Sequence, residues 1–186
     1  MSKVHTDEDI AKANVGEVQE LNDKVILSEY NPQWPKDYET LKKKIQQALS
    51  HLDIQIEHVG STSVPGLMAK PIIDIVLIVP DSRDELSYIP PLEEQNFWLK
   101  IREPDWFEHR MLKSHDFQVN LHVFSRDCSE VEMMIKFRDH LINNKGDFLL
   151  YQKTKKDLSK RVWKYTQNYA DAKSEVVRDI FSRIKS

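Results

Sequence analysis

The chain has 186 residues, with 27 basic and 30 acidic side chains, one cysteine and a formal net charge of −3. This length fits one ordinary domain that can bury a real core, and the net charge argues against a dedicated nucleic-acid binder. A lone cysteine fits a reducing compartment, and the charged first 22 residues contain no secretory signal, so we expect a cytoplasmic protein. The longest apolar run, 72–79, is only eight residues and contains an aspartate, so no membrane span is expected.

The charge is unevenly spread along the chain. Residues 151–186 carry ten basic and four acidic side chains, whereas the rest of the chain is acidic. A basic C-terminal part could meet a phosphate-bearing ligand, and a solvated helix surface is the plainer alternative.

The first half of the chain predicts a loosely attached acidic lead followed by strands and one helix. A short helix is expected around residues 8–15 of the lead, which covers residues 1–23. Pro35 fits the first turn of a helix, and apolar residues at helical spacing follow it. The predicted elements are a strand over 24–30, a helix over 36–50, and strands over 53–59 and 72–79.

The second half predicts a hairpin and a helical end. Residues 82–97 contain Pro90-Pro91 and are expected to be irregular with a short helix, and 106–113 with 117–124 are expected to form a hairpin. From Glu130 onward the periodicity is helical, with breaks near 144–146 and 162–167 that give three helices. The sequence therefore predicts an α+β fold, in which a mixed sheet within residues 24–127 is packed by C-terminal helices over 128–186.

A cluster of small residues connects the strands predicted on either side of it. The chain has only four glycines, far below the roughly 7% of average usage, yet Gly60 and Gly66 both lie here. Between them, Ser61, Thr62 and Ser63 can offer hydroxyls and successive backbone N–H groups to phosphate oxygens. Gly60 has no side chain and would let the backbone approach a phosphate closely.

Asp74 stands out because it interrupts the most apolar strand of the chain. It shares one face of that strand with Ile72, Val76 and Ile78, where a carboxylate is costly unless it is paired or bound to metal. A structural carboxylate that caps a neighbouring loop and a metal ligand are equally supported by this pattern.

Gly60-Ser61, followed after twelve residues by Asp74-Ile75, resembles the signature of the polymerase-beta-type nucleotidyltransferase superfamily. More closely, the chain resembles the GrpB family, a nucleotidyltransferase-like group, over residues 24–185. The motifs that carry this resemblance are residues 57–74, Leu121-His122-Val123, Phe137-Arg138-Asp139, Tyr151 with Lys155, and Tyr169 with Lys173.

The resemblance implies a nucleotidyltransferase-like mixed sheet, with the glycine-serine turn near a nucleotide phosphate and Asp74 on Mg²⁺. Active superfamily members place a second carboxylate two residues later, where this chain has Val76. Two carboxylates on one face can hold paired metal ions, so the usual metal triad is incomplete here. Glu57 is one acid near the motif that could complete the metal site, and it is equally suited to anchor the turn by hydrogen bonds.

The sequence suggests different roles for two histidines near the motif. His58 shares its strand face with Ile54 and Ile56, which favours a satisfied, half-buried side chain over a ligand. His122 shares a polar strand face with Asn120 and is therefore the better candidate for a catalytic role.

Each predicted C-terminal helix carries one cation on its apolar stripe. These cations are Arg138, Lys155 and Lys173. A single instance would indicate only an apolar stem with its charged end reaching solvent. Three in succession suggest a shared anion pocket, to which Lys70, just before the Asp74 strand, would add a further charge.

Two functions follow from these residues. In the first, Mg²⁺-dependent transfer of a nucleotidyl group to a small molecule, Asp74, His122 and Arg138 are catalytic and Asp74 and Glu57 bind metal. In the second, the chain is a non-catalytic nucleotide- or anion-binding module with a degenerate metal site. Both use the same phosphate-binding residues: Gly60, Ser61, Thr62, Ser63, Lys70, Lys155 and Lys173.

Overall fold

The computed structural model describes residues 4–184 and is built around a five-stranded mixed sheet. The spatial order is β2-β3-β6-β5-β4, in which β3 and β6 are parallel and the other neighbouring pairs are antiparallel. The strands are β2 (Gln55–Val59), β3 (Ile73–Val79), β4 (Phe97–Glu103), β5 (His109–Ser114) and β6 (Val119–Ser125). The predicted α+β class with a mixed sheet is confirmed, as is the hairpin formed by β5 and β6.

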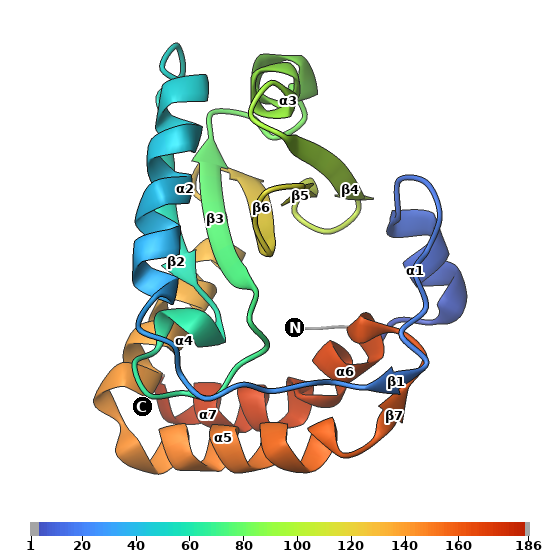
Figure 1. The fold of residues 1–186 in the computed structure, drawn as a ribbon, viewed down its shortest axis with the longest axis vertical. Helices are drawn as coiled ribbons and strands as arrows, with labels where there is room; N and C mark the ends of the chain where they lie inside the picture. Colours follow the sequence, from blue (N-terminus) through green and yellow to red (C-terminus); the bar gives the residue numbers. More distant parts are fainter. Residues whose placement is uncertain (1–3, 185–186) are drawn as a thin grey trace.

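One face of the sheet is covered by α2 (Trp34–Ala48) and α3 (Glu85–Glu93), which stand beside it in Figure 1. Leu41 and Ile45 of α2 are fully buried against Ile75 and Leu77 of β3, in the largest apolar cluster of the described residues. This packing fixes the register of β3, because a shift by one residue would move its apolar side chains to the other face.

The opposite face meets α4 (Ser129–Asn143), and α5 (Lys145–Ser159), α6 (Thr166–Ala172) and α7 (Ser174–Ile184) form a layer beyond it (Figure 1). Val76 of β3 and Phe124 of β6 are fully buried in a cluster that includes Val131 of α4. Three helices were predicted from residue 130 onward, whereas residues 129–184 form four. The additional break is at Lys173, which caps the C-terminal end of α6 and directly precedes the first residue of α7.

Two strand predictions need correction. Residues 24–30 do not form one strand, because Val25 packs on the C-terminal helices and only a short β1 (Asp23–Lys24) pairs with β7 (Val162–Trp163). The alternation in that segment therefore reflects burial against helices and not against a sheet. The structure also contains the edge strand β4, which follows α3 and was not predicted. Its first residue, Phe97, was predicted to be the end of the irregular segment 82–97.

The N-terminal lead is not loosely attached. Within α1 (Asp7–Ala13), Ile10 is only 6% exposed, and the backbone N–H of Val15 donates to Lys100 of β4. His5 bonds to the buried carboxylate of Asp171 in α6. The lead thus bridges the edge of the sheet and the C-terminal helices. Within residues 4–184, no helix is both long and apolar enough to cross a membrane.

Replacement of Ile10 with alanine should loosen this bridge without unfolding the sheet. Truncating a buried isoleucine to alanine lowers the free energy of unfolding by about 2–5 kcal/mol when the side chain belongs to the main core. Because α1 has few other apolar contacts, it can instead separate from the sheet while the rest of the protein stays folded. We expect faster amide hydrogen exchange in residues 7–15 of the I10A variant and unchanged exchange in β3. Equal acceleration in both segments would show that the lead is integral to the main core.

Candidate anion-binding site

A cavity of about 560 Å³ lies between the sheet and the C-terminal helices. Segments far apart in the sequence meet there: the turn after β2, the polar faces of β3, β5 and β6, and the helices α5 and α6. The N-terminal lead adds Ile10, Asn14 and Val18 to its wall. The predicted site residues that line it are Gly60, Ser61, Thr62, Lys70, Asp74, His122, Lys155 and Lys173.

The turn after β2 is built tightly against Asp74. Gly60 has φ +69° and ψ −170°, a conformation restricted to glycine, and a Cβ atom there would lie 2.5 Å from Asp74 Oδ2. The chain then forms the short 3-10 helix η1 (Ser61–Ser63), and the Ser63 hydroxyl donates to the Gly60 carbonyl at 2.5 Å. Gly60 therefore makes room for the carboxylate of Asp74 as well as opening the turn toward the cavity.

Asp74 is held ionised by its neighbours. Its side chain is 30% exposed, Asn120 donates to Oδ1 at 2.8 Å, and His122 Nε2 lies 3.8 Å from the same oxygen. Burial acts to raise the pKa of Asp74, but the bonds from His122 and Asn120 and the charge of Lys70 outweigh it and leave the pKa below its ordinary value. The aspartate is therefore a fixed negative charge in the wall of the cavity.

Five lysines line the same cavity: Lys70, Lys100, Lys113, Lys155 and Lys173. Burial, and after it the charge of Lys173, lower the pKa of Lys70 to about 8 and that of Lys155 to about 6. Burial also lowers the pKa of Lys113 and of Lys173, although Asp74 opposes these shifts. Mutual repulsion and desolvation destabilise these cations, and the attraction of an anion in the cavity would offset both.

Few partners within residues 4–184 compensate these charges. Asp74 is the only carboxylate among the described residues of the cavity wall, and Lys155 donates to the backbone carbonyl of Met68. None of Lys70, Lys113, Lys155 and Lys173 has a described carboxylate within ion-pair distance. A cluster of buried cations without acidic partners is the arrangement expected where the missing charge comes from a ligand.

Two buried polar atoms in the wall also lack partners among the described residues. Tyr169 is 1% exposed, and its hydroxyl makes no hydrogen bond, although the ammonium groups of Lys70 and Lys173 lie 5.8 and 4.8 Å from its ring centre. The Oδ1 atom of Asn120 is similarly unpaired. Buried hydroxyls and amides are normally satisfied, so both atoms point to a ligand or to ordered water in the cavity.

The same residues do not form a Mg²⁺ site by themselves. Val76, at the position of the missing second carboxylate, is fully buried beneath α4, and no group of three or more acidic, histidine or cysteine side chains within residues 4–184 could hold a metal. Mg²⁺ requires oxygen ligands, and a lone carboxylate surrounded by lysines offers a poor set. The wall is better suited to an anion than to a divalent cation.

The remaining predicted residues lie outside the cavity wall. Arg138 donates to Glu57 and to the backbone carbonyl of His58, both at 2.8 Å, and also pairs with Asp139. This network ties α4 to β2, and it engages Glu57 in a hydrogen-bonded anchor close to the turn. Ser63 lies within η1 but is not among the wall residues.

His58 lies on the apolar side of β2. Its ring stacks on Tyr38 and bonds to the Thr62 hydroxyl at 3.1 Å, and burial lowers its pKa to about 4. His58 is therefore a neutral, hydrogen-bonded side chain that supports the turn through its bond to Thr62.

Sequence reasoning missed several wall residues that come from the edge of the sheet. Met111 and Lys113 project from β5 into the cavity, and Met111 lies opposite His122 in the register of β5 and β6. Residues 109, 111 and 113 share one face of β5, because side chains alternate along a strand. The polar side chains among them, His109 and Lys113, could have indicated that this face of β5 continues the polar face of β6. Lys100 could not be placed, because its strand was not predicted.

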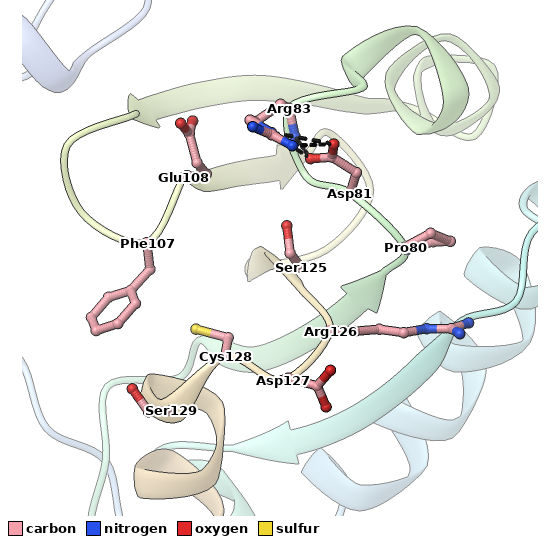
Figure 2. Close-up of a pocket in the computed structure, with 10 residues that line it drawn as sticks. All are labelled: Pro80, Asp81, Arg83, Phe107, Glu108, Ser125, Arg126, Asp127, Cys128 and Ser129. Atoms are coloured by element: carbon pink, nitrogen blue, oxygen red, sulfur yellow. Dashed lines mark hydrogen bonds and ion pairs between the residues drawn. The ribbon is translucent and has the colours of Figure 1, made fainter.

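A second pocket, of about 400 Å³, lies at the opposite ends of β3 and β6 (Figure 2). Figure 2 shows the Asp81–Arg83 ion pair on one side of it and Phe107 and Cys128 on the other. None of the predicted site residues lines this pocket, so it is separate from the cavity beside Asp74.

The chain is similar in sequence to bacterial proteins along most of its length. It is 49% identical over 182 residues to the UPF0157 protein BH1888 of Halalkalibacterium halodurans, covering 98% of this chain and 93% of that protein. It is 40% identical over 157 residues to the UPF0157 protein SCO7215 of Streptomyces coelicolor, covering 84% of this chain and 82% of the other.

The structural comparison agrees with the sequence comparison. The crystal structure of the conserved protein GrpB from Enterococcus faecalis superposes with a TM-score of 0.68 at 26% identity, covering 84% of this chain and 99% of that one. The family model described as GrpB protein matches residues 24–183, which contain both the turn and the lysine-rich helices. The chain therefore belongs to the GrpB family.

Proposed function

We propose that this protein binds a phosphate-bearing small molecule, such as a nucleotide, in the cavity formed by the Gly60–Ser63 turn, Asp74 and the lysines. The observation that carries the proposal is the excess of five lysines over one carboxylate in the described wall. A phosphate group would raise the lowered pKa values of Lys70, Lys155 and Lys173 and accept hydrogen bonds from all three once they are protonated, and the unpaired Tyr169 hydroxyl could donate to the same group.

The size and lining of the cavity support a ligand larger than a single phosphate. A volume of about 560 Å³ lies within the usual range for small-molecule sites. Apolar side chains complete the wall beside the charged groups, and they suit the uncharged body of an organic phosphate. These side chains are Ile10, Val18, Leu27, Met134 and Phe137.

The wall favours binding over Mg²⁺-dependent nucleotidyl transfer. Transfer of the superfamily type uses metal ions to neutralise charge, and this wall supplies lysines where carboxylates would be needed. Positioning and charge neutralisation dominate phosphoryl-transfer catalysis, so transfer remains the second candidate, with the lysines in the neutralising role.

Thermal unfolding of the full chain with ATP, AMP and pyrophosphate, with and without Mg²⁺, tests the proposal. A ligand at 100 times its dissociation constant stabilises by about 2.7 kcal/mol, which raises Tm by about 5–10 °C for a chain of this size. We expect such a rise for the wild type, and at most a small one for Lys173→Met.

Lys156→Met is the matched control, because it removes an exposed cation of α5 that is not among the wall residues. Its Tm rise on adding ligand should equal that of the wild type. A wild type that none of the phosphate compounds stabilises would refute the proposal. Stabilisation that requires Mg²⁺ would instead favour the transferase.

A further inference from the structure

The N-terminal lead forms a loop whose two ends meet at Lys164. Asp7, at the start of α1, pairs with the Lys164 ammonium group, and Glu20 lies 3.8 Å from the same nitrogen. The backbone N–H groups of Leu21 and Asn22 donate to the Lys164 carbonyl at 2.7 and 3.2 Å. Lys164 therefore contacts the chain at both ends of the loop.

Between these ends, the loop reaches the edge of the sheet. The N–H of Val15 donates to the Lys100 carbonyl at 2.8 Å, and the Lys100 ammonium group donates to the Glu17 carbonyl at 2.7 Å. Figure 1 shows α1 beside the end of β4, from which the chain returns to β1. Lys100 lines the cavity, and Lys164 directly precedes the wall residues 165–167. The loop therefore runs from the helical side of the cavity to the sheet side.

The loop turns uncharged side chains toward the cavity. Ile10, Asn14, Val18 and Gln19 are part of the wall. Residues 4–23 carry six acidic side chains and one lysine, and none of these charged residues lines the cavity. The loop therefore completes the wall without adding a carboxylate beside the lysines.

The contacts of the loop allow it to separate from the rest of the protein. Ile10 is the only buried residue among residues 4–20, and it belongs to none of the four apolar clusters of the described residues. The ion pair between Lys164 and Asp7 is exposed, and exposed pairs contribute little to stability. Leu21, by contrast, packs into the apolar cluster that contains Tyr169. We therefore expect the loop to open as a local unit about a hinge near Leu21, while the sheet stays folded.

We propose that residues 4–20 are a lid on the phosphate site, that the lid opens to admit the ligand and closes over its uncharged part, and that Lys164 holds the lid closed. In the closed state Ile10 and Val18 contact the organic part of the ligand, and the lysines contact its phosphate. This inference rests on the proposed phosphate site and describes how that site is entered and closed.

A disulfide between the lid and the sheet tests whether the ligand enters beneath the lid. Asn14 and Ile101 are partners in an isolated antiparallel bridge, and residues paired in this way have Cα atoms about 4.5–5.5 Å apart, which suits a disulfide. Oxidation of the Asn14→Cys, Ile101→Cys double variant should keep the lid closed. We expect surface plasmon resonance with ATP over the immobilised full chain to show association about tenfold slower for the oxidised form than for the reduced form.

The comparison of oxidised and reduced forms separates closure of the lid from the change of side chains, because both forms carry the same two cysteines. The wild type under the same two conditions controls for its single cysteine, Cys128, which lines the second pocket, and should bind ATP at one rate. Equal association rates for the two forms of the double variant would overturn the lid and leave the phosphate site standing. A wild type that binds neither ATP nor pyrophosphate would count against both.

Lys164→Met tests the residue that holds the lid, without changing the cavity wall. Lys164 is not a wall residue, and its replacement removes the contacts with Asp7 and Glu20. We expect the dissociation rate of ATP to rise about threefold to tenfold, and that of pyrophosphate, which has no organic part for the lid to cover, to change less. Lys160→Met, which removes another exposed cation whose partner is Asp157, should leave both rates unchanged. Equal rates of ATP release from the two variants would overturn the role of Lys164.

Discussion

Replacement of Gly60 with alanine is expected to destabilise the protein by about 2–4 kcal/mol and to disrupt the proposed anion site. The backbone at Gly60, with φ +69° and ψ −170°, is strained for any residue with a Cβ atom, and that atom would lie 2.5 Å from Asp74 Oδ2 and 2.9 Å from Asp74 Cβ. Either the turn or the carboxylate must move. Urea unfolding of the two proteins measures the loss.

Gly66→Ala separates the collision with Asp74 from the strain of the backbone. Gly66 also has a positive φ, +79°, but a Cβ atom added there would meet only Phe148 Cζ, at an ordinary contact distance of 3.9 Å. We expect a loss of only about 1 kcal/mol and unchanged phosphate binding. If the two substitutions cost the same, the contact between Gly60 and Asp74 contributes nothing to stability.

Replacement of Lys155 with methionine is expected to have opposite effects on folding and on binding. Lys155 is 2% exposed on α5, and burial lowers its pKa from 10.5 to about 6. Removal of this buried amine should abolish the phosphate-induced rise in Tm. At pH 7 the free energy of unfolding of the ligand-free protein should rise by about 1–2 kcal/mol, because removing the cost of burying the amine outweighs the loss of its hydrogen bond to the Met68 carbonyl.

The pH dependence of stability provides the sharper measurement. Between about pH 6 and pH 10 the unfolded chain holds a proton on Lys155 that the folded chain does not, so the stability of the wild type rises with pH across this window. Lys155→Met should lose that part of the slope. Lys156→Met, at the exposed neighbouring position, is the control and should keep it. A variant at position 155 with the wild-type slope would show that Lys155 is charged in the folded protein.

The turn and its aspartate could be predicted from the sequence because their signal is local. A strand, a run of small residues and a second strand follow one another without a long insertion, and the alternation along β3 placed Asp74 and Val76 on one face. Lys155 of α5 and Lys173, the C-cap of α6, were also predicted, because a cation on an apolar stripe is visible without knowledge of the tertiary structure. Both lie in the cavity wall, as that pattern suggested.

The parts that could not be predicted depend on pairing between distant segments. Arg138 lies on a stripe like that of Lys155, but its helix crosses β2 and brings it to Glu57 instead of the cavity. The contact between the lead and Lys100 requires the edge strand β4, which the sequence prediction lacked. The N-terminal lead carries no strong periodicity, and only the structure shows that it closes the cavity wall.

The pairing of β1 with β7 also constrains how the molecule assembles. These two short strands are about 140 residues apart in the chain, so they pair only when a loop of that length is closed. During synthesis the sheet and α2 can form early, whereas Lys155, Lys173 and the lead can meet in the cavity wall only after α5 and α6 emerge. A nascent chain therefore has its aspartate and turn before it has Lys155 and Lys173, and the wall of the proposed site is complete only after α6 has been made.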